Sequence, residues 1–293
     1  MRNKKNKAIK SAESVAALRA SAHQDTDREI KCKDYLAKHF LKNRYKLLTS
    51  IKPHSLQKKI LEKIAPGSYN YIVTRTKHFD EILLNEIANN IEQLVILGAG
   101  YDTRGIRFQK ALRNASIFEV DIHSTQSQKK NVLNKKISFT PPQNYTFVSL
   151  DFTKDDLRES LEKHGFSITQ KTLFLWEGVS YYLPEKDVKK TLNFVSLCKK
   201  GSSIVFDYSI KSFVLGDHST YGGKKLAKWL KKIKEPFLFG LAPEETANFI
   251  KECNLKLLSD LGPEELSNQY LINSKGKIEG NTLGHARMVH ASS

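Results

Sequence analysis

The stretch QLVILGAGYDTR, residues Gln93–Arg104, decides the fold of this chain. An apolar strand runs directly into a Gly-Ala-Gly turn, and Asp102 follows two positions later. A second strand, Ser116–Asp121 (SIFEVD), ends on an acid about twenty residues further on. Strand, glycine turn, helix and acid-tipped strand form the front half of a doubly wound nucleotide-binding fold. In such a fold the glycines admit a ligand close to the backbone, and the acid accepts hydrogen bonds from both ribose hydroxyls.

The rest of the chain agrees with that interpretation. Residues 1–90 show only helical patterns, whereas short apolar strands alternate with amphipathic helices after residue 90. This alternation predicts an α/β fold with a mostly parallel sheet over 91–293, covered on both faces, and a helical extension over 1–90. Asn281–His290 is expected to add a last strand, antiparallel, at the far end of the sheet. The other predicted strands are Leu94–Leu97, Ile117–Asp121, Phe147–Leu150, Leu173–Trp176, Ser203–Asp207 and Lys256–Asp260, and the predicted helices between them are Thr103–Arg113, Ser124–Lys135, Asp155–His164, Glu185–Lys199 and Pro243–Cys253.

A long insertion follows the fifth predicted strand. It occupies residues 210–240, contains Gly216, Gly222 and Gly223, and carries two aromatic clusters. Ligands of such sheets bind outside the carboxyl ends of the strands. We therefore expect this insertion to cover the site as a lid.

Composition narrows the class of protein. With 293 residues, 40% hydrophobic and 27% charged, the chain has the make-up of a globular enzyme, and no apolar run is long enough to cross a bilayer. The basic start Met1–Lys10 has no apolar segment after it, since Glu13 and Arg19 interrupt the sequence. The expected location is therefore cytoplasmic. The cysteines and the nine histidines lack metal-ligand spacing, so no metal site is expected and Cys32, Cys198 and Cys253 are predicted to be free buried thiols.

The net charge of +17 has more than one explanation. Most of the excess positive charge comes from lysines, which are spread from Lys4 to Lys277. Arginine, whose guanidinium binds phosphate with two hydrogen bonds, is sparse. A lysine-rich solvated surface explains this pattern. The dense cluster Lys224–Lys234 (KKLAKWLKKIK) keeps open an RNA-binding role or an acidic partner.

The glycine turn itself argues against a dinucleotide cofactor. A nicotinamide fingerprint has a third glycine where this chain has Thr103. Asp102 adds a negative charge at the helix N-terminus, where a pyrophosphate would lie. S-adenosylmethionine has a ribose and a zwitterionic amino-acid end but no phosphate, so an acidic loop does not exclude it. The turn glycines Gly98 and Gly100, with Asp121, therefore favour S-adenosylmethionine.

Further acids lie at the ends of the third and fourth predicted strands. Asp151-Phe152 follows the third strand, where a carboxylate can accept from an adenine amino group while the aromatic ring packs on the base. Glu177 follows the fourth strand. The structural alternative for Asp151 is a helix N-cap ahead of Thr153–Leu157. Acids at successive strand ends are hard to explain by capping alone.

The ordered motifs resemble a known family. GAGYDTRGIRF, FEVD, FVSLDF and LFLWEGVSYYLP, together with SAESVAALRA and RTKHFDE, resemble the leucine carboxyl methyltransferase family, particularly its bacterial branch of S-adenosylmethionine-dependent methyltransferases. The resemblance covers about residues 11–210 and implies a class I methyltransferase (Rossmann-like) sheet with a helical N-terminal extension. It also implies that Asp121, Asp151 and Phe152 contact the ribose and adenine, that Gly98 lines the methionine portion, that Arg75 pairs with the methionine carboxylate, that Glu177 lies at the floor, and, more loosely, that Arg19 contacts the cofactor.

Arg75 also has an explanation from the residues alone. A guanidinium just ahead of the first strand can hold a carboxylate with two hydrogen bonds. Its structural alternative is an ion pair with Asp80 or Glu81. The segment from Lys211 to Gly240 matches no family motif, so we expect its residues to determine which substrate is bound.

The methyl acceptor is expected to be a carboxylate of a small molecule or a peptide terminus. An ionised carboxylate needs no general base for in-line methyl transfer. The segment from Glu177 to Tyr181 (EGVSY) lacks the Asn/Asp-Pro-Pro-Tyr turn typical of amino-group methylation of nucleobases, and no cysteine lies near the predicted site. Arg104, Tyr181 and Tyr182 are the candidate acceptor contacts, with helix decoration and core packing as their alternatives. An RNA- or tRNA-directed methyltransferase is the alternative function.

Overall fold

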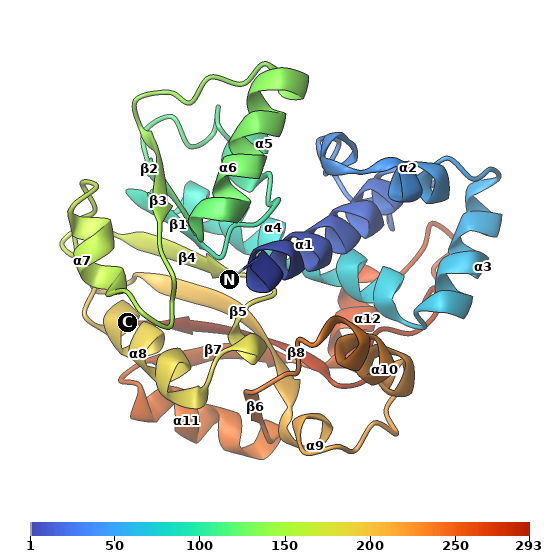
Figure 1. Ribbon diagram of the computed structural model, residues 1–293. Helices are drawn as coiled ribbons and strands as arrows, with labels where there is room; N and C mark the ends of the chain where they lie inside the picture. The colour runs from blue at the N-terminus through green and yellow to red at the C-terminus, as the bar shows by residue number, and fades with distance from the viewer. Residues whose placement is uncertain (1) are drawn as a thin grey trace.

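The computed structural model describes residues 2–293, and the side chains from Ser11 onward, so the basic segment Met1–Lys10 lies outside the described side chains. One eight-stranded sheet organises the described chain, in the order β3-β2-β1-β4-β5-β8-β7, with β6 pairing to β5 off this path (Figure 1). The pairs among β1 to β6 are parallel and those of β8 are antiparallel. The strands are β1 (Gln93–Leu97), β2 (Ser116–Asp121), β3 (Tyr145–Ser149), β4 (Thr172–Trp176), β5 (Ser203–Ile210), β6 (Gly240–Leu241), β7 (Lys256–Leu261) and β8 (Ala286–Ser292).

The six predicted strands are confirmed. Every residue of β1 and β4 is buried, as are all but the last of β5. Such continuous apolar strands lie in the interior of a parallel sheet because helices cover both of its faces. The sequence therefore predicted the doubly wound sheet correctly.

The place of the last strand was predicted wrongly. β8 is antiparallel, as expected, but it lies between β5 and β7 rather than at the far end. Its residues Met288, Val289 and Ala291 have no exposed surface. A strand with buried side chains on both faces gains most from an interior position, where it has a neighbour on each side.

Helices cover both faces of the sheet (Figure 1). Side chains of α8 and α11 belong to one buried cluster with β4 and β5, and side chains of α4 and α12 belong to another with β1. The helices are α1 (Arg2–His23), α2 (Asn43–Thr49), α3 (His54–Ile64), α4 (Ser68–Ala88), α5 (Arg104–Arg107), α6 (His123–Val132), α7 (Leu157–Glu162), α8 (Glu185–Ser196), α9 (Lys211–Val214), α10 (Gly223–Ile233), α11 (Thr246–Glu252) and α12 (Pro263–Tyr270), with shorter helical turns at Ala37–Phe40, Leu133–Ile137, Ser180–Tyr182 and Pro243–Glu245.

The first helix after the glycine turn is shorter than predicted. The pattern favoured Thr103–Arg113, whereas α5 ends at Arg107 and turns follow it. Gly105 lies in its middle, and glycine costs a helix interior about 1 kcal/mol relative to alanine. A Cβ at Gly105 would lie 2.8 Å from the Tyr145 hydroxyl, so the close packing requires glycine there.

Two further expectations concern burial and membranes. The three cysteines are free and buried, as predicted. No helix of the described chain combines the length and the apolarity needed to cross a membrane.

The insertion after β5 consists of α9, α10 and a connecting loop. The backbone N–H groups of Leu238 and Phe239, at the end of that loop, donate to the carbonyl oxygen of Tyr181 at 2.7 and 3.3 Å. The insertion is thus hydrogen-bonded to the segment that follows β4, beside the carboxyl edge of the sheet. Its behaviour as a lid stays a prediction.

Candidate active site

The carboxyl edge of the parallel strands gathers the residues that the sequence singled out. The register pairs Ile96 of β1 with Leu175 of β4 and Asp121 of β2 with Ser149 of β3. The glycine turn, Asp121, Asp151 and Glu177 therefore follow neighbouring strands at one edge. That edge is where ligands of doubly wound sheets bind.

The glycine turn is held by the acid of the second strand. Gly98 and Gly100 have φ values of +63° and +44°, a region that other residues rarely adopt. A Cβ at Gly98 would overlap the Val179 side chain, so the turn needs glycine for space as well. The Asp121 carboxylate accepts from Gly100 N–H at 2.5 Å and from Ile122 N–H at 2.6 Å. Burial raises the pKa of Asp121, and these two N–H groups partly offset that effect.

Asp151 and Phe152 lie beside Asp121. Leu150 N–H donates to the Asp121 carbonyl oxygen at 3.0 Å, which joins the two strand ends. The Asp151 carboxylate accepts from the backbone N–H and the hydroxyl of Thr153, at 3.1 and 2.8 Å. The residue that caps α7 is Asp156, so Asp151 closes a turn and does not cap the helix. The Phe152 ring lies 6.3 Å from the Trp176 ring, measured between centroids.

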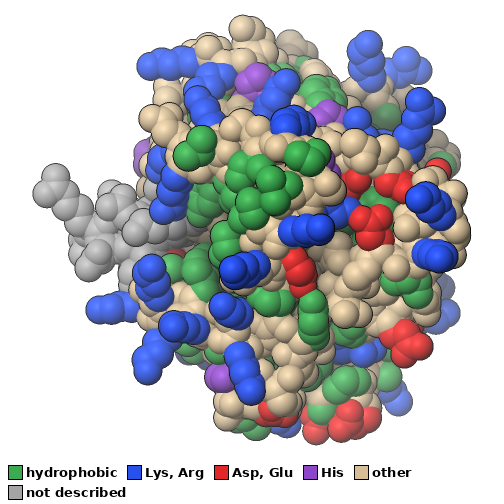
Figure 2. All heavy atoms as spheres, turned by 90° about the vertical axis from the view of Figure 1, so that its right-hand side faces the viewer, with side chains coloured by type: hydrophobic (Ala, Val, Ile, Leu, Met, Phe, Trp, Pro, Cys, Tyr) green, Lys and Arg blue, Asp and Glu red, His purple; other side chains and the backbone are tan. Residues whose placement is uncertain are grey.

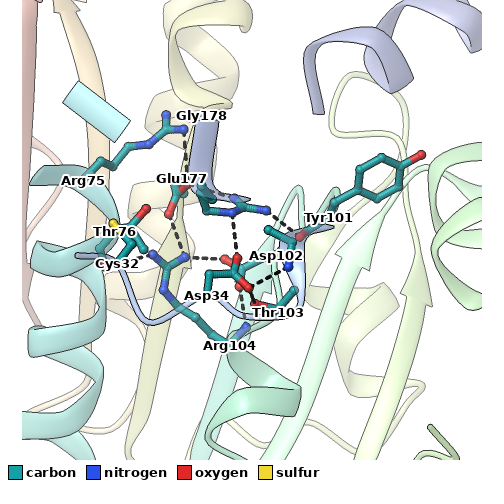
Figure 3. A network of polar contacts seen from close by, with 12 residues as sticks. Cys32, Asp34, Arg75, Thr76, Tyr101, Asp102, Thr103, Arg104, Glu177 and Gly178 are labelled. Carbon is teal, nitrogen blue, oxygen red and sulfur yellow. Dashed lines mark hydrogen bonds and ion pairs between the residues drawn. The ribbon is translucent and has the colours of Figure 1, made fainter. Parts of the chain in front are cut away.

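Glu177 is the centre of a buried cluster of charges (Figure 3). Its carboxylate lies 2.7 Å from Arg104, 3.2 Å from Arg75 and 3.7 Å from Arg19. Burial alone would raise the pKa of Glu177, but Arg104 and Arg75 outweigh it and hold that pKa below its ordinary value. Glu177 is therefore an anion at neutral pH, fixed by arginines from three separate segments of the chain.

Arg104 has its donors engaged within the protein. Its guanidinium binds Asp80 at 2.7 Å, Asp102 at 2.5 Å and Glu177 at 2.7 Å, and the side chain is 1% exposed. The sequence suggested it as an acceptor contact, with helix decoration as the alternative. Its ion pairs in the structure are with protein carboxylates, and its contact with an acceptor stays a prediction. Asp102, which the sequence treated as a sign against pyrophosphate, is one of its partners.

Arg75 pairs with a residue that the sequence analysis missed. Its guanidinium lies 2.7 Å from Asp207 of β5, and within the described chain its ion pairs are with Asp207 and Glu177 rather than with the expected alternative partners, Asp80 and Glu81. Asp207 also accepts from the Tyr71 hydroxyl and from Gly178 N–H, both at 2.6 Å. Asp207 ends the predicted apolar strand SIVFD, so an acid at a fifth strand end was the available signal.

Tyr181 and Tyr182 lie together beside this cluster. Their rings are 4.8 Å apart, and the Phe237 ring of the insertion lies 4.2 Å from that of Tyr181. Burial raises the pKa of both phenols, so they are neutral hydrogen-bond donors at physiological pH. Arg75 and Tyr181 border the same small space, since a Cβ at Gly178 would lie 3.3 Å from Arg75 Nη1 and 3.5 Å from the Tyr181 hydroxyl.

The helical extension reaches the site through α1. Arg19 donates to the Tyr101 carbonyl oxygen at 2.6 Å and pairs with Asp34 at 2.9 Å. A Cβ at Gly100 would lie 3.6 Å from that of Ala12, so α1 passes directly over the glycine turn. In the part of the chain with described side chains, no cluster of three His, Cys, Asp or Glu residues is arranged to hold a metal ion.

Comparisons with known proteins agree with this geometry. The family model of the leucine carboxyl methyltransferases matches residues 12–196. The chain is 31% identical to the "Putative S-adenosyl-L-methionine-dependent methyltransferase YktD" of Bacillus subtilis (strain 168), over 70% of this chain and 67% of that protein. It is 35% identical to a protein of the same description from Mycolicibacterium gilvum, over 47% of this chain and 55% of that protein.

A solved structure supports the fold. A crystal structure described as a "putative methyltransferase" from Thermobifida fusca YX superimposes with a TM-score of 0.54, over 95% of this chain and 94% of that one, at 13% identity. The sheet is that of a class I methyltransferase, and the cofactor is S-adenosylmethionine. The chain belongs to the leucine carboxyl methyltransferase family of S-adenosylmethionine-dependent methyltransferases.

Proposed function

We propose that this enzyme is an O-methyltransferase that methylates a carboxylate of a small molecule or of a peptide terminus. The observation that carries the proposal is the protonation state of the groups around Tyr181. Tyr181 and Tyr182 are neutral donors, and Glu177 is bound to arginines. None of these groups is suited to take a proton from an acceptor, so an acceptor that arrives already ionised fits best.

The residues at the carboxyl edge suit the cofactor. We assign Asp121 to the ribose hydroxyls and Asp151 with Phe152 to the adenine, as neighbours at two strand ends. Gly98 and Gly100, both partly exposed, would line the methionine portion. Arg75 would hold the methionine carboxylate. Its buried Nε has no hydrogen-bond partner among the described residues, which leaves one donor for a ligand.

Glu177 and Arg104 are assigned to the floor of this site. Glu177 is an anion between arginines, and an anion there can also balance the ammonium group of the cofactor. Arg104 is a positioning residue in this assignment, because its contacts fix Asp102 and Glu177.

The chemistry required of the protein is modest. S-adenosylmethionine supplies a methyl group that its sulfonium has already activated. In the proposed reaction a carboxylate oxygen would form the new C–O bond as the S–C bond of the bound cofactor breaks, so no residue of the protein would have to remove a proton. We assign the Tyr181 hydroxyl to orienting that carboxylate, and the neighbouring rings of Tyr182 and Phe237 to excluding water from it.

The stability of the product in alkali tests the proposal. The enzyme is incubated with methyl-labelled S-adenosylmethionine and a panel of carboxylic acids and free-carboxyl peptides, and the products are treated with alkali. A methyl ester releases its label as volatile methanol, whereas ethers, methylamines and C-methyl products keep it. Label that resists alkali would overturn carboxylate methylation. A matched panel with amidated termini controls for transfer to other groups.

A further inference from the structure

The insertion after β5 borders a cavity of about 410 Å³. Small-molecule sites commonly have volumes of roughly 300–1,000 Å³. The wall is mostly apolar, with Phe213 and Val214 from α9, Leu230 from α10 and Phe237 from the following loop. The cavity therefore has the size and lining of a site for an apolar or aromatic group.

The cavity lies next to the proposed reaction site. Phe237 lines it and also packs on Tyr181, with ring centroids 4.2 Å apart. Tyr181 in turn borders Arg75. The Phe237 ring thus lies between the cavity and the place where we put the acceptor carboxylate, so the two spaces are neighbours.

A buried histidine packs against the wall of the cavity. The His285 ring lies 4.0 Å from Phe213 and 6.2 Å from Phe237, between centroids. The residue is 2% exposed, and neither ring nitrogen has a hydrogen-bond partner in the described chain. Buried polar atoms are rarely left unpaired, so such a group commonly meets a ligand or a water. Burial lowers the pKa of His285 to about 4, which makes it a neutral donor and a weak base.

Positive charge borders the same cavity. Lys231 and Lys234 line it and are exposed. Figure 2 shows Lys and Arg side chains gathered at the lower left of that face of the molecule. Lysines at the rim of an apolar cavity attract anionic ligands and fix their orientation.

We propose that this cavity binds the non-reacting part of the methyl acceptor, and that the acceptor is an organic anion with an aromatic or apolar body and a second negative group. The body packs on Phe213 and Phe237, and the second negative group meets Lys231 and Lys234. This inference rests on the proposed carboxylate methylation and adds the class of substrate.

A pair of fluorescent probes tests the cavity without any methyl transfer. 1-Anilinonaphthalene-8-sulfonate is an aromatic anion, and N-phenyl-1-naphthylamine is the same aromatic body without the sulfonate. We expect the anion to bind the full chain at one site and more tightly than the neutral probe. Ala227→Phe and Val214→Phe, which fill the cavity from α10 and α9, should weaken both probes by about ten- to a hundredfold.

Two lysine variants separate charge from volume. Lys231→Gln with Lys234→Gln should weaken the sulfonate up to about tenfold and leave the neutral probe unchanged. Lys224→Gln with Lys225→Gln, on the same helix and away from the cavity lining, is the matched control and should change neither. Calorimetry with S-adenosylmethionine checks that each variant is folded.

The outcomes are distinct from those of the alkali experiment. Unchanged probe affinity in a folded cavity-filling variant overturns the cavity as a ligand site. Equal losses for both probes in the Lys231/Lys234 variant overturn the selection for an anion. Neither result affects the conclusion drawn from an alkali-labile product. Equally, an alkali-stable product would not affect the conclusion drawn from the two probes. The two proposals can therefore fail separately.

Discussion

Asp121 is held in place before any ligand arrives. One carboxylate oxygen accepts from Gly100 N–H and the other from Ile122 N–H, so Asp121→Asn keeps an acceptor for only one of these contacts. Asp121→Ala removes the carboxylate that we assign to the ribose, and hydrogen bonds to a charged group contribute about 1.5–3 kcal/mol each. We expect Asp121→Ala to weaken S-adenosylmethionine at least about tenfold by calorimetry, Asp121→Asn to weaken it less, and NAD to give no heat with the wild type.

The exposed acid Glu159 offers a matched control for this measurement, because it lies on α7 outside the site. Glu159→Ala should bind the cofactor as the wild type does. Full affinity in Asp121→Ala would contradict the assignment of this residue to the ribose.

At the scale of elements, α1 is a cover for the glycine turn. Arg19 connects it to the Tyr101 carbonyl oxygen and to Asp34. Arg19→Ala breaks both contacts, although the small side chains of α1, such as Ala16 and Ala20, still pack on the body. We expect cofactor affinity to fall about tenfold, and amide exchange in α1 and in the turn to accelerate, as followed by mass spectrometry.

Arg28→Ala is the control for the α1 prediction, because Arg28 is exposed and lies beyond the end of α1. It should change neither cofactor affinity nor amide exchange. An Arg19→Ala protein with wild-type affinity would show that α1 covers the turn without contributing to binding.

At the scale of the whole molecule, buried histidines make stability depend on pH. Burial lowers the pKa of His78 and of His285 to about 4, from an ordinary value of 6.5. Both are neutral in the folded chain, so unfolding takes up protons as the pH falls below about 6.5. The free energy of unfolding is therefore unaffected by these two histidines above that pH and decreases as the pH falls from about 6.5 toward 4. The decrease is at most about 1.4 kcal/mol per pH unit for each histidine.

Urea denaturation at several pH values between about 7 and 5 measures that slope. The variant His78→Phe/His285→Phe should flatten it, whatever its absolute stability. Carboxylates whose pKa is lowered in the folded chain, such as Glu177, do not change the slope in this range. The stability that they contribute is lost only when the pH falls below the pKa of the same group in the unfolded chain, which is near 4.5 for a glutamate. A free energy of unfolding that does not change over this range would contradict the prediction.

The sequence predicted what is local and missed what depends on distant contacts. Strand and turn patterns are periodic, so β1 to β5 and the carboxyl edge followed from them. The position of β8 depends on pairing with β5 and β7, which no local pattern contains. Asp207 acquires its partner Arg75 from a position 132 residues away, and His285 matters only because Phe213 and Phe237 surround it.

The interior position of β8 also has a consequence for the kinetics of folding. Among the described strands, β7 pairs with β8 alone, and a long stretch of chain lies between β5 and β8 in the sequence. Such non-local pairing is slow, because loop closure has to precede the contacts that stabilise it. Until it forms, the buried edge of β5 is an open, apolar strand edge, which is the kind of surface on which partly folded chains aggregate. We expect the pairing of β8 to limit the rate at which this enzyme becomes native.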